Sequence, residues 1–202
     1  MELLEKRILE DGIVRPGHIL KVDSFLNHQI DAGLVREMAL EYKRLFAGLP
    51  ITKILTIEAS GIAIASIAAL EFGVPMVFAK KTESKNLDGE VYTSKVHSYT
   101  KGREYDIMVA KRFLSPDDKV LILDDFLAVG KALSGLLDIV GQAGAQCLGI
   151  GVAIEKGFQG GGDRLREAGY NLHSLAIVEE MGDDSITFRA QPKKPSAALQ
   201  KN

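Results

Sequence analysis

The chain has 202 residues, of which 46% are hydrophobic and 26% charged, which is enough for one compact core and short for two. Its net charge of −2 and its scattered Lys and Arg disfavour a purely DNA-binding protein. A lone cysteine, Cys147, excludes an intrachain disulfide and is expected to be a small buried hydrophobe. No apolar run approaches the ~18 residues of a membrane span. We therefore expect a cytoplasmic protein with no membrane or nucleic-acid partner.

Helical spacing of apolar residues alternates along the chain with short apolar runs, which predict buried strands. In chain order, we predict a helix at Glu2–Glu10, an irregular segment at Ile13–Asn27, a helix at Asp31–Leu45, a strand at Lys53–Ile57, a helix at Ile62–Leu70, strands at Pro75–Ala79 and Val120–Leu123, a helix at Leu133–Val140, a strand at Cys147–Ile154, a helix at Arg164–Ala168 and a last strand at Leu172–Val178. This alternation predicts an α/β fold with a mostly parallel central sheet flanked by helices on both faces.

Residues 80–111, between two of the predicted strands, are polar and contain Gly89 and Gly102. Apolar and polar residues alternate in Val91–Val96 and Tyr105–Val109, which predicts an antiparallel excursion into solvent. Insertions of this length are often functional, so we expect a flexible lid. The tail, 191–202, is polar and contains proline, and we expect it to be disordered.

Two adjacent acids, Asp124 and Asp125, close the strand predicted at Val120–Leu123. In open parallel sheets, ligands gather at the carboxyl ends of the strands. Carboxylates there can accept hydrogen bonds from a ribose diol. The backbone N–H groups of residues 128–132, at the start of a helix, can bind a phosphate, aided by Lys131. The alternative explanation is a solvated strand end that caps the helix.

This segment resembles the signature of the type I phosphoribosyltransferases, which is an apolar run, two acidic residues and a Thr-Gly-rich phosphate loop. Two of the usual threonine positions are Val129 and Ala132 here, so backbone N–H groups must bind the phosphate without those hydroxyls. Ala128 stands where the hypoxanthine and guanine members carry an aspartate that faces the purine. A group for handling the purine proton is therefore missing at that position.

The resemblance covers nearly the whole chain and is greatest with the bacterial members that act on xanthine, through Glu155–Gly162, Leu20 and Asn27. It implies the type I phosphoribosyltransferase fold in a single domain, residues 1–190, with a small base-binding hood at 1–30 and the lid at 80–111. It also implies a purine salvage reaction. The 5-phosphoribosyl group of phosphoribosyl pyrophosphate (PRPP) would be transferred to N9 of xanthine, giving xanthosine 5'-monophosphate and pyrophosphate.

The resemblance further implies a role for each part of the site. Asp124 and Asp125 would be the catalytic residues. Glu58–Gly61 would bind pyrophosphate through backbone amides, although Ser60 and Gly61 would equally cap an ordinary helix. Lys80 and Lys81 would meet pyrophosphate oxygens, unless they lie on a solvated face. The implied PRPP-binding residues are Glu58, Ala59, Ser60, Gly61, Lys80, Lys81, Ala128, Val129, Gly130, Lys131 and Ala132.

The implied base-binding residues are Leu20, Asn27, Phe126 and Lys156. Lys156 would donate to the 6-oxo group of a purine and repel the amino group of adenine, although a lysine after a strand is more often a surface residue. Asn27 would pair with the 2-oxo edge and Leu20 would cover the ring. Phe126 would stack on the base or pack in the core. Lid residues that could close over the site are Tyr92, Ser94, Lys95 and Tyr99.

The four histidines are widely spaced, which makes a zinc site built by the protein improbable. We expect any metal to be Mg²⁺ carried on the substrate's pyrophosphate, with few protein ligands required. The resemblance also implies a homodimer. Three alternatives stay open: the same reaction with hypoxanthine, guanine or uracil, a PRPP-sensing regulator with the same fold that binds nucleic acid, and a nucleotide-binding domain without catalysis.

Overall fold

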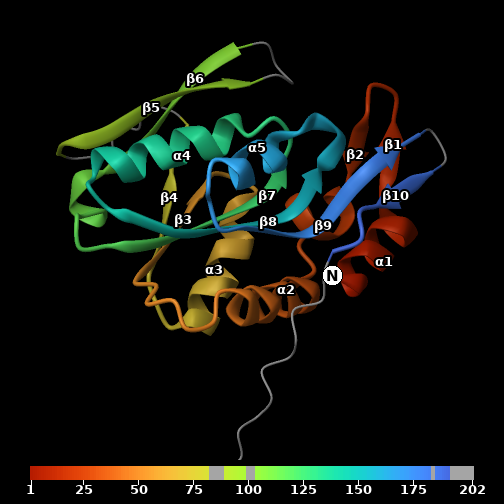
Figure 1. Cartoon of the computed structure of the whole chain (residues 1–202), viewed down its shortest axis with the longest axis horizontal. Helices are drawn as coiled ribbons and strands as arrows, with labels where there is room; N and C mark the ends of the chain where they lie inside the picture. The colour runs from red at the N-terminus through yellow and green to blue at the C-terminus, as the bar shows by residue number, and fades with distance from the viewer. Residues whose placement is uncertain (82–88, 99–102, 183–184, 192–202) are drawn as a thin grey trace, which may run out of the picture.

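A six-stranded sheet with the order β10-β9-β8-β7-β3-β4 forms the centre of the computed structural model, which describes residues 1–81, 89–98, 103–182 and 185–191 (Figure 1). β3, β4, β7, β8 and β9 are parallel, and only β10 runs antiparallel to its neighbour. The mostly parallel sheet predicted from the sequence is confirmed. The strands are β3 (Lys53–Ile57), β4 (Met76–Ala79), β7 (Lys119–Leu127), β8 (Gln146–Lys156), β9 (Leu172–Met181) and β10 (Ile186–Phe188).

Helices cover both faces of this sheet, as predicted. The helices and single turns are α1 (Glu2–Asp11), η1 (Asp23–Asn27), α2 (Ala32–Leu45), α3 (Gly61–Phe72), η2 (Lys111–Phe113), α4 (Lys131–Gln142), η3 (Gly157–Gln159) and α5 (Gly161–Glu167). In Figure 1, α2 and α3 lie on one face and α4 and α5 on the other. Successive side chains of β7 point to opposite faces of the sheet. Leu121 packs in the core under α2 and α3, and Ile122 packs in the core under α4.

The N-terminal region contains a hairpin that the sequence did not reveal. Strands β1 (Ile13–Arg15) and β2 (Ile19–Lys21) pair antiparallel within the segment predicted to be irregular. Gly17 and His18, at the tip, both adopt positive φ angles, which favour a tight turn. The hairpin is followed by η1, a π-helical turn, and then by Asp31, whose side chain accepts a hydrogen bond from the N–H of Leu34 and caps α2.

The predicted antiparallel excursion is present as β5 (Val91–Ser98) and β6 (Arg103–Ala110). Its expected exposure is only partly correct, because Val96 and Ile107 are buried against α4. A Cβ on Gly135 of α4 would lie 2.6 Å from Val96, so the glycine allows the hairpin to approach the helix closely. Backbone bonds between Lys80 and Met108 join the hairpin to the end of β4.

Several strand ends lie beyond the predicted ones. β7 continues past Leu123 to Leu127, so Asp124 and Asp125 lie within the strand rather than after it. β8 likewise ends at Lys156 rather than at Ile154, and β9 is followed by β10 instead of being the last strand. α5 begins at Gly161, three residues before the predicted start at Arg164. Of the tail predicted to be disordered, residues 192–202 lie outside the described residues.

Cys147 is partly buried at the start of β8, where its Sγ lies 3.5 Å from the Gly149 carbonyl oxygen. Burial raises the pKa of its thiol to about 11. The prediction of a small buried hydrophobe is therefore only partly correct, because the side chain is partly buried. None of the helices in the described part of the chain has the length and apolarity that crossing a bilayer requires.

Candidate active site

Asp124 and Asp125 lie next to each other in the second half of β7, and both are buried. The backbone N–H of Asp125 donates to Asp124 Oδ1 at 3.0 Å, and Asn27 Nδ2 donates to Asp125 Oδ2 at 3.3 Å. A Cβ on Gly61, the first residue of α3, would lie 3.3 Å from Asp124 Oδ1. The carboxylate pair therefore lies between the hood and the loop that follows β3.

Burial raises the pKa of Asp124 well above its ordinary value, and the neighbouring charge of Asp125 raises it further. The charge of Lys81 acts in the opposite direction. Ionising a buried carboxylate is costly and does not stabilise the fold. A carboxylate of this kind near the carboxyl ends of parallel strands is typical of a functional site. The pair is therefore suited to meet a ligand that brings hydroxyl donors or positive charge.

The segment predicted to bind phosphate leads directly from β7 into α4. Ala128 and Val129 are half-buried, and Gly130 precedes α4 with a φ of 88°, a left-handed conformation that favours glycine. Lys131 is exposed on the first turn of α4. The first N–H groups of a helix have no acceptor within the helix, so this end can bind an anion through its backbone. The five predicted residues, 128–132, thus form the connection from the end of β7 into the first turn of α4.

The other predicted PRPP-binding residues meet at the ends of β3 and β4. The N–H of Lys81 donates to Glu58 Oε1 at 2.6 Å, and the N–H of Glu58 donates to the Ala79 carbonyl at 3.1 Å. The Glu58–Ala59 peptide bond is cis. Ser60 makes no side-chain capping bond to α3, so the ordinary cap considered from the sequence is not formed. Lys81 is exposed, and its Nζ lies 5.5 Å from the ring centre of Tyr105.

The predicted base-binding residues converge from the hood and from two strands. Lys156 Nζ donates to the carbonyl of His18, at the hairpin tip, at 2.9 Å, and lies 6.0 Å from the ring centre of Phe126. Asn27 reaches Asp125, next to Phe126. Leu20 is buried in the hood. Lys156 is therefore not a free surface lysine, and Phe126, which is half-buried, packs against the core.

Burial lowers the pKa of Lys156. The hydrogen bond to His18 brings the hood hairpin over the end of β8, and His18 also packs against Phe158, with 5.6 Å between ring centres. Lys156 thus connects the hood hairpin to the end of β8. Its three N–H donors leave capacity for further acceptors, such as the oxo group of a planar base.

The candidate lid residues lie on or next to the β5–β6 hairpin. Tyr92 lies beside Lys111, with 5.6 Å from its ring centre to Nζ, Ser94 is buried and Lys95 is exposed. In the described part of the chain, none of these three side chains makes a hydrogen bond, ion pair or ring contact with Asp124. Tyr99 lies outside the described residues.

Two tyrosines near the carboxylates were not recognised from the sequence. Tyr42 of α2 is fully buried, and burial followed by the charges of Asp124 and Asp125 raises its pKa. Tyr105 of β6 is affected in the same way by burial and by Asp124. Helical spacing at Tyr42 and alternation at Tyr105 identified the elements, but neither pattern carries information about contacts between elements.

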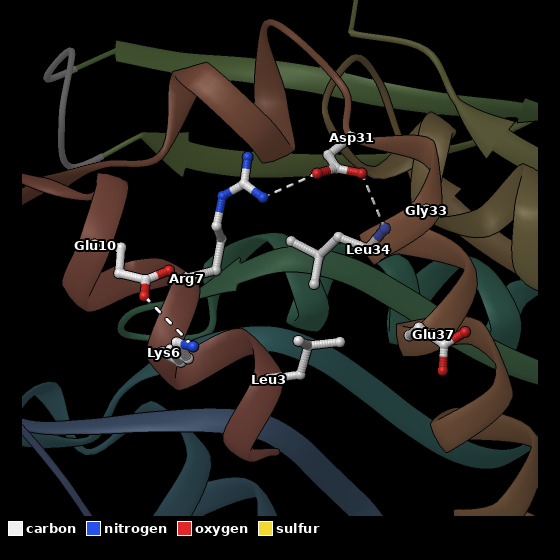
Figure 2. Close-up of a pocket in the computed structure, with 8 residues that line it drawn as sticks. All are labelled: Leu3, Lys6, Arg7, Glu10, Asp31, Gly33, Leu34 and Glu37. Atoms are coloured by element: carbon white, nitrogen blue, oxygen red, sulfur yellow. Dashed lines mark hydrogen bonds and ion pairs between the residues drawn. The ribbon is translucent and has the colours of Figure 1, made fainter.

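Within the hood, Arg7 of α1 contacts the η1 turn and the start of α2. Figure 2 shows Arg7 reaching across a pocket between α1 and the start of α2, where its Nη1 bonds to Asp31 Oδ2 at 2.9 Å. The guanidinium also lies 5.2 Å from the ring centre of Phe25, in the η1 turn that ends at Asn27. The pocket contains none of the predicted site residues. Arg7 thus links α1 to η1, the turn that ends at Asn27, and to the start of α2.

The donor set at the sheet edge fits a hard cation only in part. Carboxylate oxygens are suitable ligands for Mg²⁺, which keeps several waters and is often held mainly by substrate phosphates. Within the described ranges, no three His, Cys, Asp or Glu side chains are grouped as metal ligands. The carboxylate oxygens are thus compatible with an Mg²⁺ ion that arrives on an anionic substrate.

Comparison with known proteins agrees with this geometry. The chain matches the phosphoribosyl transferase domain over residues 21–166. It is 57% identical to the xanthine phosphoribosyltransferase of Lachnoclostridium phytofermentans, over 94% of this chain and 98% of that protein, and 58% identical to that of Ruminiclostridium cellulolyticum, over 93% and 99%. Among solved structures, APRTase from Giardia lamblia aligns with a TM-score of 0.73 and 25% identity, covering 88% of this chain and 98% of that one. The chain therefore belongs to the phosphoribosyltransferase family.

Proposed function

We propose that this protein transfers the 5-phosphoribosyl group of PRPP to N9 of xanthine, releasing pyrophosphate and forming xanthosine 5'-monophosphate. One observation carries the proposal: the buried Asp124–Asp125 pair leads directly into the start of α4 and also contacts Asn27 of the hood. One short segment thus lies next to the proposed positions of the phosphate, the ribose and the base. The high identity to proteins named xanthine phosphoribosyltransferase supports the same choice.

In this mechanism the protein acts by positioning and by electrostatics. Backbone N–H groups of Ala128–Ala132 bind the 5'-phosphate, and Asp124 and Asp125 accept hydrogen bonds from the ribose hydroxyls. As the bond to pyrophosphate breaks, positive charge develops on the ribose, and the two carboxylates stabilise it. Glu58–Gly61 and the lysine pair, Lys80 and Lys81, bind the departing pyrophosphate. No covalent nucleophile is required.

Base choice depends on Lys156 and Asn27. The ammonium of Lys156 donates to a 6-oxo group and repels the amino group of adenine, and the Asn27 amide donates to the 2-oxo group that distinguishes xanthine from hypoxanthine. Asn27 already donates to Asp125, so its orientation is fixed before the base arrives. Leu20 and Phe126 provide apolar cover for the ring.

The proposal includes Mg²⁺ bound with PRPP, held mainly by substrate oxygens and water, which would neutralise charge on the leaving pyrophosphate. It also includes a cytoplasmic homodimer without nucleic-acid or membrane partners, in keeping with the slightly acidic net charge of −2. We assign residues 1–190 to one catalytic domain, with 1–30 as the base-binding hood and 80–111 as a flexible lid.

The test is nucleotide formation by the purified chain with PRPP and Mg²⁺, offered xanthine, hypoxanthine, guanine, adenine and uracil separately. We expect xanthosine 5'-monophosphate as the dominant product, identified by chromatography against standards. A greater kcat/KM with another base would overturn the choice of xanthine. If no nucleotide formed with any base while PRPP binding was measurable, a PRPP-sensing regulator would be favoured.

A further inference from the structure

Glu155 is a fully buried carboxylate next to Lys156, at the end of β8. Arg166 of α5 forms a two-pronged ion pair with it, with Nη1 at 3.0 Å from Oε1 and Nη2 at 2.6 Å from Oε2. The hydroxyl of Ser174, on β9, donates to the same Oε2. Desolvating a carboxylate this completely is costly, and the full set of hydrogen bonds offsets that cost. Glu155 thereby fixes α5 to the sheet.

The run of glycines at the start of α5 makes two close contacts that other residues could not. A Cβ on Gly162 would lie 2.0 Å from Glu155 Oε1, and a Cβ on Gly161 would lie 2.1 Å from the carbonyl oxygen of Ala128. Two neighbouring residues thus touch the buried carboxylate on one side and the segment that precedes α4 on the other. A second contact joins the same parts, because Arg164 Nη2 donates to the Val129 carbonyl at 3.2 Å.

The rest of the ionic network keeps α5 from shifting. Asp163 accepts hydrogen bonds from both Arg166 and Arg189, and Arg189 also donates to Glu179 of β9. These partners lower the pKa of Asp163. α5 is only seven residues long, too short to hold its place by its own helical bonds. Its position is therefore set by the bonds it makes to β8 and β9.

We propose that Glu155 is a positioning residue for the phosphate loop, acting through Arg166 and the glycine pair that touches Ala128. The inference rests on the proposed function of residues 128–132 as the part that binds the 5'-phosphate of PRPP. Val129 and Ala132 offer no hydroxyl, so backbone N–H groups must bind the phosphate. These groups bind a phosphate well only when they already point toward it. Holding the loop from behind supplies that orientation.

The closing experiment measures the dissociation constant for PRPP with Mg²⁺ and no base, and separately the KM values for PRPP and xanthine. Glu155→Gln and Gly161→Ala are each expected to weaken PRPP binding by about tenfold or more, while the KM for xanthine stays within about twofold. Ser174→Ala removes one hydrogen bond to Glu155 and is expected to weaken PRPP binding by about threefold. It serves as the milder variant should Glu155→Gln fail to fold.

The matched control is Gly149→Ala, at the other end of β8, where a Cβ would lie 2.5 Å from the Phe46 ring. It destabilises the same strand without touching α5, so its PRPP affinity should stay within about twofold of the original. The double variant of Glu155→Gln and Gly161→Ala should lose less affinity than the product of the two single losses, because both act through one contact.

Several outcomes would overturn the inference. These are unchanged PRPP affinity in both Glu155→Gln and Gly161→Ala, an equal loss in Gly149→Ala, or a rise in the KM for xanthine alone, which would mean that Glu155 serves only its neighbour Lys156. If the unaltered chain bound PRPP but converted no base, the proposed function would fail, and the PRPP affinities would still decide the role of Glu155. A chain that did not bind PRPP would overturn both proposals.

Discussion

The ribose–phosphate half of the site and the base half are built in different ways, although they meet at Asp125. The first half is one continuous stretch, Asp124–Ala132, which passes from a buried strand into a helix. The second half collects Asn27 and Leu20 from the hood and Lys156 from another strand, and it depends on contacts such as the bond from Lys156 to His18. Damage to the first half should abolish the reaction, whereas damage to the second should change which base is used.

The largest effect is expected from Asp124→Asn and Asp125→Asn. Each should lower kcat by at least about 100-fold, because the ribose loses a partner for its hydroxyls and for its developing charge. Steady-state rates with saturating PRPP and xanthine measure this. Asp117→Asn, in an exposed turn, is the control and should keep full activity. Rates within threefold of the original in both site variants would mean that this half does not carry the chemistry.

Substitutions in the base half should have a smaller and more selective effect. Asn27→Ala should lower kcat/KM for xanthine by about 10- to 100-fold while leaving hypoxanthine, which has no 2-oxo group, nearly unchanged. Lys156→Gln should lower kcat/KM for both purines. The KM for PRPP serves as the internal control in each assay. A parallel rise in the KM for PRPP would remove the distinction between the two halves.

A weaker test reaches the base half from a distance. Arg7→Met removes the ion pair to Asp31 and the contact with Phe25 that support the turn ending at Asn27. Both partners of the pair are partly exposed, so we expect only a two- to fivefold rise, roughly, in the KM for xanthine and none in that for PRPP. Lys6→Met is the control, since the Lys6 side chain is 73% exposed. An equal change in the KM for xanthine in both variants would contradict a supporting role for Arg7.

The smallest effect concerns stability. Burial and Asp125 raise the pKa of Asp124, so the folded chain keeps this proton at pH values where the unfolded chain has lost it. The stability that comes with the bound proton is present below the unfolded value of 3.8 and is lost as the pH rises through the higher folded value. Asp124→Asn, which stays neutral, should therefore melt about 2–4 °C higher at neutral pH and show no gain near pH 3.

Calorimetry of both proteins across this pH range measures the difference. The matched control is Asp117→Asn, whose melting temperature should follow the original protein at every pH. An Asp124→Asn variant that melted lower at neutral pH would show that the buried carboxylate supports the fold rather than straining it. The ribose–phosphate half would then have a structural role in addition to its chemistry.

The comparison between the two halves also explains what could be predicted from the sequence. The β3–α3–β4 unit and α4 follow from unbroken apolar patterns. β7 was predicted to end at Leu123 because Asp124 and Asp125 interrupt its apolar run, and buried carboxylates of this kind are expected where function opposes folding. The hairpin at 13–21 and β10 consist of strands of three residues, too short for alternation to be recognised.

The site was predictable to the extent that it is local. Residues 124–132 form one recognisable segment, whereas the contacts of Lys156 with His18 and of Gly161 with Ala128 join residues whose proximity depends on the whole fold. The resemblance to the family supplied Leu20, Asn27 and Lys156, which spacing alone could not connect. Glu155 lies in a segment that carries the resemblance, but its ion pair with Arg166 depends on tertiary packing. Tyr42 and Tyr105 had no such help, because each reaches the site only through tertiary packing.

The unreactive state of Cys147 has a practical consequence for spectroscopy. Burial raises the thiol pKa to about 11, so little thiolate is present at pH 7, and the thiolate is the form that attacks alkylating reagents. Cys147 should therefore contribute little background to maleimide labelling. A cysteine introduced at an exposed position such as Ile19, on the hood hairpin, can carry a fluorophore or spin label selectively, without first removing Cys147.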